Sequence, residues 1–238
     1  MAGTDLTSSQ LALGGVPLGS SLDEEESFAL MDAYVASGGN MIDTAEVYAN
    51  WLPGTQSISE CTIGNWMKSR GNRNNLIVTT KGAHPRLPTM EISRMSREEI
   101  TEDVDGSLRR LQVDTIDLYW LHRDDRNRHA GEILDTLNNL VKEGKIRYFG
   151  CSNWTANRIQ EAQLYAESHG LQSFSANQPM WSLASVDPSA MEDRTLVVMD
   201  EELLHLHRLD QLEDSLKADK VRFTEAEIAY LTLLDDET

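Results

Sequence analysis

The sequence predicts an α/β protein in which helices pack outside a parallel sheet. Short apolar, β-branched runs alternate with amphipathic helical patterns, and the connections between them are short. No linker or low-complexity segment divides the 238 residues. No Gly-x-Gly-x-x-Gly pattern follows the first predicted strand, so a Rossmann dinucleotide fold has no support. By its length, the chain could form one α/β barrel or two smaller domains.

The first predicted strand covers residues 11–16 and ends in two glycines. Residues 20–26 supply caps and first-turn acids for a helix that ends at Gly38 and Gly39. Ser96 and Glu99 form a capping box for a later helix, whose apolar face holds Ile100, Val104, Leu108 and Leu111. Between these two helices we expect a strand over 41–44, a helix over 62–69 and a strand over 76–80.

The second half continues the alternation. The predicted strands cover 115–121, 146–151 and 174–177, and the predicted helices cover 132–141, 156–168, 199–207, 211–217 and 223–234. These elements make six strand–helix units, whereas a closed (β/α)8 barrel needs eight.

The composition excludes several classes of partner. The chain has 21 basic and 39 acidic residues and a formal net charge of −18. Nucleic acids and anionic membranes bind clustered Lys and Arg, so neither is expected as a partner. No signal-like segment or long apolar run occurs, which favours a cytoplasmic protein. Cys61 and Cys151 are best interpreted as free thiols in a reducing compartment, and a Cys-rich metal site is not expected.

Four polar residues lie at or just after the carboxyl ends of three successive predicted strands, where a barrel places its catalytic side chains. They are Asp43, Tyr48, Lys81 and His122. Singly, each has a structural explanation, namely a turn cap, a packing residue, a solvated strand end and a satisfied histidine at a barrel rim. Together they are expected to converge at one end of the sheet, and a shared chemical role explains this convergence better than coincidence does.

This set suits proton donation by a phenol. A tyrosine is a weak acid near neutrality, and a neighbouring Lys81 ammonium stabilises its phenolate. Asp43 would hold the ammonium in place, and His122 would orient the reacting oxygen. The set has no nucleophile–base pair and no metal cluster, so it favours reduction of a carbonyl over hydrolysis. No side chain can supply hydride, so a cofactor must.

The chain resembles the aldo-keto reductases, NAD(P)H-dependent enzymes built on a (β/α)8 barrel. The matching stretches are GGNMIDTAEVYAN, LIVTTKGA, DTIDLYWLHRDD, GKIRYFGCSNW, SANQPMWSL and QLEDSL. They occur in the family's order and cover nearly the whole chain. The resemblance implies that Tyr48 is the acid–base group and that Asp43, Lys81 and His122 support it.

The resemblance also implies cofactor and substrate contacts. Ser152, Asn153 and Gln178 match positions that hold the nicotinamide carboxamide, although the first two could also cap a helix. Gly15 and Val16 match the stretch beside the nicotinamide ribose, Asp43 is also expected to contact the cofactor, and the adenine end would meet Gln211, Asp214 and Ser215. A solvated helical face explains the last three residues equally well. Trp51 would line the substrate pocket together with Tyr48 and His122, or simply pack there.

The barrel that the resemblance implies is incomplete. The region of its seventh and eighth strands is missing between MDEELLHLHR and LDQLEDSLKA. We therefore expect a single domain over 1–238 with a break in the sequence near Arg208–Leu209, where residues of the whole protein are omitted. A real deletion is the alternative, and it would leave the four polar residues intact while weakening cofactor binding.

The leading functional hypothesis is an oxidoreductase that reduces aldehydes or ketones to alcohols with NADPH, or alternatively NADH. Its partner would be a small carbonyl substrate. A cofactor-binding regulatory subunit with little turnover is the second hypothesis. A barrel lyase or isomerase is a third, and it requires Ser152, Asn153 and Gln178 to be ignored. The physiological substrate and the oligomeric state are not readable from the sequence.

Overall fold

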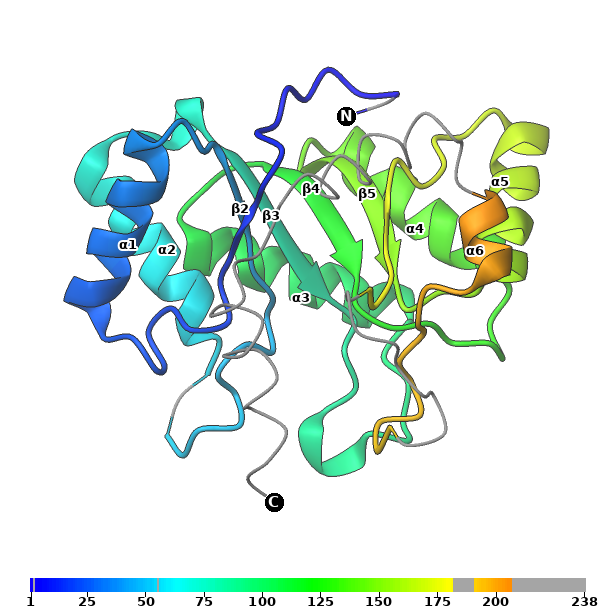
Figure 1. The fold of residues 1–238 in the computed structure, drawn as a ribbon. Coiled ribbons are helices and arrows are strands. Elements are labelled where there is room, and N and C mark those ends of the chain that lie inside the picture. The colour runs from blue at the N-terminus through cyan, green and yellow to red at the C-terminus, as the bar shows by residue number, and fades with distance from the viewer. Residues whose placement is uncertain (2, 55, 182–190, 207–238) are drawn as a thin grey trace, which may run out of the picture. The chain divides into compact units, whose positions relative to one another are not determined.

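The computed structural model describes residues 1, 3–54, 56–181 and 191–206, and the chain divides after Val198 into two compact units. The first unit contains a parallel sheet whose strands are in sequence order (Figure 1). Its described strands are β1 (Leu13–Gly14), β2 (Met41–Asp43), β3 (Ile77–Gly82), β4 (Ile116–Leu121), β5 (Ile146–Ser152) and β6 (Asn177–Gln178).

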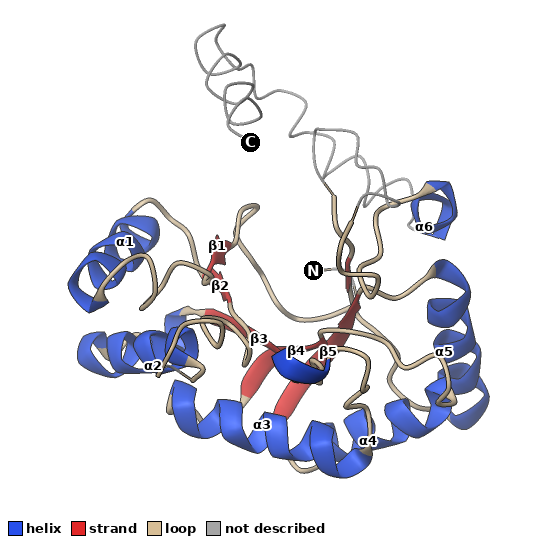
Figure 2. Cartoon of the chain, turned by 90° about the horizontal axis from the view of Figure 1, so that it is seen from below, coloured by secondary structure: helices blue, strands red, loops and turns tan. Residues whose placement is uncertain are grey.

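Helices alternate with these strands along the chain. They are α1 (Glu24–Ala36), α2 (Ile58–Arg70), α3 (Arg97–Leu111), α4 (Ala130–Lys142) and α5 (Ala156–His169). Figure 2 shows that the five helices form an arc outside the curled sheet. Short 3-10 helices, Arg73–Asn75 and Leu87–Thr89, lie on either side of β3 in the sequence. This arrangement is a half-barrel of the (β/α)8 type, in agreement with the predicted fold class.

The second unit is described only over residues 199–206. It contains the short helix α6 (Glu201–Leu206), within the predicted helix over 199–207. Asp200 accepts a hydrogen bond from the Leu203 amide at 2.8 Å and so caps its first turn. The predicted break at Arg208–Leu209 and the helices predicted over 211–217 and 223–234 lie outside the described residues.

The predicted helix starts are well defined in the structure. Ser96 accepts a hydrogen bond from the Glu99 amide at 3.3 Å, and the Glu99 carboxylate accepts one from the Ser96 amide at 3.1 Å. This capping box confirms the prediction for α3. Asp23 and Glu26 form an equivalent box at the start of α1, within the predicted capping segment.

The two strands at the edges of the sheet differ from the prediction. β1 contains only two of the six predicted residues, since side chains bind the backbone before it: Tyr34 donates to the Leu11 carbonyl at 2.7 Å. The strand prediction for 174–177 is wrong for its first three residues. Phe174 instead packs its ring against Phe149 and Trp154, with centroids 5.9 and 4.9 Å apart.

The core lies on both sides of the sheet. Every residue of β3 and β4 is buried, as expected for parallel strands that are covered on both faces. Leu6, from the N-terminal segment, joins Ile77, Leu118 and Trp120 in one buried apolar cluster. The length and burial of β3 and β4 give the polar residues at their carboxyl ends a rigid support. Among the described helices, none has the length and apolar character needed to span a membrane.

Candidate functional site

Three neighbouring strands bring the four predicted catalytic residues to one edge of the sheet. Asp43 ends β2, Lys81 lies at the end of β3, and His122 directly follows β4. The register pairs Asp43 with Thr79 and Lys81 with Trp120, so the strands end at similar heights. Tyr48 lies in the loop after β2, and the Glu46 amide anchors this loop by donating to the Lys81 carbonyl at 2.8 Å.

The ammonium group of Lys81 is the centre of this cluster. It forms an ion pair and hydrogen bond with Asp43 and donates to the Tyr48 hydroxyl oxygen at 3.2 Å. A further hydrogen bond runs to the Thr44 carbonyl at 3.1 Å. Asp43 also accepts a hydrogen bond from the Thr79 hydroxyl at 2.6 Å. The carboxylate, ammonium and phenol therefore form one continuous polar chain.

Lys81 remains charged although it is only 2% exposed. Burial by itself would lower the pKa of Lys81, but the negative charge of Asp43 and the hydrogen bonds to Asp43 and Tyr48 raise it above the ordinary value. A buried cation needs such a partner, because an unpaired charge in the interior is very unfavourable.

His122 lies beside this chain as a neutral ring. Burial, together with the positive charges of Lys81 and Arg123, holds its pKa well below the ordinary value. Its ring is edge-to-face with Tyr48, with 6.0 Å between centroids. The Nδ1 atom of His122 is buried and has no hydrogen-bond partner among the residues that the structure describes. Trp51 is half exposed, and its ring lies 6.5 Å from that of Tyr48.

The predicted carboxamide-binding residues gather at the ends of β5 and β6. Asn153 donates to the His122 carbonyl at 3.0 Å and to the Ser152 hydroxyl at 3.1 Å. Ser152 in turn donates to the Gln178 carbonyl at 2.7 Å, and the Gln178 amide lies 3.4 Å from the Asp43 carboxylate. The oxygen of the Asn153 side chain accepts from the Val197 amide at 3.0 Å. This second polar group therefore directly adjoins the first.

The other predicted cofactor contacts are less informative. Gly15 lies against the cluster: its amide donates to the Asp43 carbonyl at 2.7 Å, and a Cβ there would come within 2.9 Å of the Ser59 hydroxyl. Close packing therefore explains this glycine. Val16 is 46% exposed. Gln211, Asp214 and Ser215 lie outside the described residues.

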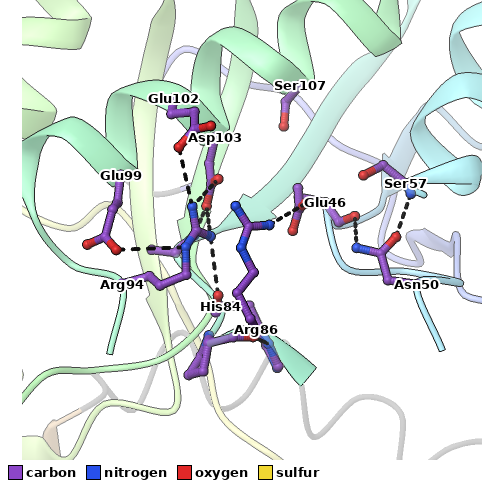
Figure 3. Close-up of polar contacts among 12 residues, drawn as sticks. Glu46, Asn50, Ser57, His84, Arg86, Arg94, Glu99, Glu102, Asp103 and Ser107 are labelled. Carbon is purple, nitrogen blue, oxygen red and sulfur yellow. Dashed lines mark hydrogen bonds and ion pairs between the residues drawn. The ribbon is translucent and has the colours of Figure 1, made fainter. Parts of the chain in front are cut away.

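The structure adds two supports that the sequence analysis missed. Arg123, which follows His122, donates to Asp193 at 2.9 Å and to Thr195 at 2.6 Å, and so holds the segment 191–198. Arg94 and Asp103 form a doubly hydrogen-bonded, buried ion pair behind the loop that follows β3 (Figure 3). In the sequence, Arg123 is only a basic residue in the stretch LHRDD, and Arg94 only an arginine nine residues before Asp103, so neither support could be predicted.

A metal centre has no ligand set in the part of the chain that the structure describes. No three His, Cys, Asp or Glu residues come together there in a way that could hold an ion. The two cysteines are free thiols, with Cys151 buried and Cys61 partly buried.

Comparison with known proteins gives a consistent result. The chain is 35% identical over 188 residues to aldo-keto reductase ausK of Aspergillus calidoustus, covering 73% of this chain and 46% of the relative. It is 33% identical to norsolorinic acid reductase B of Aspergillus parasiticus, covering 75% and 49%, respectively. It is also 32% identical to aryl-alcohol dehydrogenase [NADP(+)] of Phanerodontia chrysosporium, covering 78% and 51%.

The chain spans about half the length of the curated relatives it matches. The model of the Aldo/keto reductase family matches residues 10–198, which include β1 to β6 and both polar groups. The half-barrel, its clustered polar residues and this match lead to one conclusion: the chain belongs to the aldo/keto reductase family.

Proposed function

We propose that this chain carries the acid–base site of an NADPH-dependent oxidoreductase that reduces aldehydes or ketones to alcohols. The observation that carries the proposal is the position of Lys81, whose ammonium bonds both the Asp43 carboxylate and the Tyr48 hydroxyl. A buried ammonium beside a phenol stabilises the phenolate that remains after proton donation.

In this mechanism Tyr48 donates its hydroxyl proton to the carbonyl oxygen of the substrate. Lys81 stabilises the phenolate that forms, and Asp43 keeps Lys81 charged and in place. His122, as a neutral imidazole, donates a hydrogen bond that orients the carbonyl oxygen. Trp51, half exposed beside Tyr48, provides an apolar wall for the substrate.

The second polar group fits a nicotinamide carboxamide by its chemistry. Ser152, Asn153 and Gln178 supply a hydroxyl and two amides next to the phenol and imidazole, which are donors and acceptors of the kind that a carboxamide binds. A bound reduced nicotinamide supplies the hydride in this chemistry. One relative is named an NADP(+) enzyme, which supports NADPH over NADH.

The test replaces Tyr48 by Phe and measures NADPH consumption with benzaldehyde. Loss of the proton donor should lower kcat by about 10²- to 10⁴-fold. Tyr165→Phe is the matched control, since it removes a hydroxyl that binds Asp135 on the outer helices. An unchanged rate in Tyr48→Phe, or no turnover by the wild-type chain, would contradict the proposal.

A parallel titration with NADPH and NADH measures binding without turnover. Quenching of tryptophan fluorescence should saturate at a lower concentration of NADPH. Equal saturation by both dinucleotides would limit the proposal to a nicotinamide cofactor without phosphate preference.

A further inference from the structure

A second histidine lies beside His122, and the proposed mechanism does not use it. His84 follows the end of β3 by two residues and is only 6% exposed. Its ring packs edge-to-face against that of His122, with centroids 4.8 Å apart. A group of the substrate that reached His84 would therefore lie within a few ångströms of the carbonyl that His122 orients.

The hydrogen bond of its Nδ1 atom assigns the tautomer of His84. Nδ1 lies 2.6 Å from the Pro85 carbonyl oxygen, which can only accept, so Nδ1 carries the proton. Burial, and then the positive charge of Arg123, lower the pKa of His84 to about 4, which keeps the ring neutral near pH 7. The other nitrogen, Nε2, is then a bare acceptor, and it has no hydrogen-bond partner within the described ranges.

The backbone around His84 is held rigidly. Arg94 binds both oxygens of Asp103 at 2.8 Å and donates to the His84 carbonyl at 3.3 Å (Figure 3). Asp103 also accepts from the Ala83 amide at 2.8 Å. Ala83 adopts a left-handed conformation with φ of 58°, which non-glycine residues take only where the surroundings hold it. The ring is therefore a fixed element, as substrate recognition requires.

We propose that His84 determines substrate specificity by accepting a hydrogen bond from a hydroxyl group of the substrate. The inference rests on the proposed carbonyl reduction and names its substrate class, namely hydroxyl-bearing carbonyl compounds. Tyr48 and His122 present hydrogen-bond donors at the site in the proposed mechanism, whereas His84 presents an acceptor. A buried polar group that is left unpaired discriminates against analogues that lack its partner.

The test compares hydroxybenzaldehydes with methoxybenzaldehydes that carry the substituent at the same ring position. The methoxy group keeps the oxygen and removes the donor. In the wild type, kcat/KM should favour the hydroxy compound at one ring position or more. His84→Phe should reduce that ratio about 3- to 10-fold, since it removes one hydrogen bond. His84→Gln keeps an acceptor oxygen and should restore part of the preference. A ratio that is the same in the wild type and His84→Phe at all three ring positions would overturn the proposal.

A second measurement separates this proposal from the proposed function. Nitrogen-15 NMR of the histidine rings can follow the unprotonated Nε2 of His84 without turnover. Its resonance should move when the preferred hydroxybenzaldehyde is added and stay in place with the methoxy compound. Equal shifts, or none, would exclude the contact with His84. If neither aldehyde is reduced but the selective shift occurs, reduction fails and hydroxyl recognition stands.

Discussion

Two polar groups lie side by side at the carboxyl ends of the strands, and they are held in different ways. In the first group, Lys81 bonds the side chains of Asp43 and Tyr48. In the second, the Asn153 side chain bonds main-chain atoms of His122 and Val197. The first group thus depends on charge complementarity between side chains, and the second on where the backbone runs.

Because they are held differently, the two groups should differ in how readily they accept a ligand. The hydroxyl of Tyr48 can pass on its proton without breaking the Lys81–Asp43 pair. The Asn153 amide already uses both N–H donors and one of the two lone pairs of its oxygen, so a carboxamide that needs a donor from it would have to share or replace a bond. We therefore expect substitutions in the first group to lower both proton transfer and stability, and those in the second to act mainly on the stability of the site.

The largest effect should come from removing the charge at the centre of the first group. Lys81→Met leaves Asp43, whose side chain is 13% exposed, without its cation. Unpairing a buried charge costs about 3–5 kcal/mol of unfolding free energy, and the rate should fall by roughly 10²- to 10⁴-fold. Lys145→Met is the control, since that ion pair with Asp105 is partly exposed. Urea unfolding and NADPH consumption measure both quantities. Equal effects of the two substitutions would show that the Lys81 charge contributes no more to stability and rate than a partly exposed ion pair does.

The next effect tests the support behind His84. Asp103→Asn weakens the pair with Arg94, in which both side chains are buried. We expect the free energy of unfolding to fall by about 3 kcal/mol, as for a broken buried pair. The exposed pair Arg128–Glu132 provides the comparison, where Glu132→Gln should cost under about 1 kcal/mol. A small loss for Asp103→Asn would show that the loop after β3 is held by other contacts.

A smaller effect distinguishes the contribution of the Asn153 side chain to stability from that of its backbone conformation. Asn153 has a φ of 62°, which Gly adopts without strain and Ala adopts only at a cost in energy. Asn153→Gly should lose roughly 1–3 kcal/mol with its hydrogen bonds. Asn153→Ala should lose about 1 kcal/mol more, because it adds left-handed strain. Chemical denaturation of both variants gives the difference, and equal stabilities would mean that the backbone relaxes there.

The smallest effect is a change in pH dependence at His84. The folded-state pKa of His84, about 4, lies below the ordinary 6.5. Between these two pH values the unfolded chain binds more protons than the folded chain, so the free energy of unfolding decreases as the pH is lowered. From pH 6.5 to 5.5, the wild type should lose about 1 kcal/mol more than His84→Phe. His205→Phe, at an exposed position of α6, is the control. Parallel stability curves for the wild type and His84→Phe would contradict the assignment of a neutral, buried ring.

The sequence predicted the strands and helices of the described half-barrel well where local signals are strong. The capping box of Ser96 and Glu99 predicted the start of α3, and the run from Leu76 predicted β3. The edge strands were predicted less well, because their ends depend on partners that are distant in sequence. Tyr34, for example, donates to the Leu11 carbonyl from 23 residues away, and the paired strand begins only after it, at Leu13.

The candidate site shows the same division. The types of residue at the strand ends indicated a proton-transfer group, because the order of parallel strands brings those ends together. Nothing in KGAHP indicated that the ring of His84 contacts His122, since a left-handed turn at Ala83 and the Arg94–Asp103 pair place it there.

The alternation of strands and helices, the helix caps and the chemical groups at one edge of the sheet could therefore be predicted from the amino-acid sequence. These properties follow from local periodicity and from the order of the chain. The tertiary structure alone decided which groups bond one another: Lys81 with Tyr48, His84 against His122, and Asn153 with Val197 44 residues further on. Such contacts depend on strand register and loop conformation, which are fixed only when distant segments pack together.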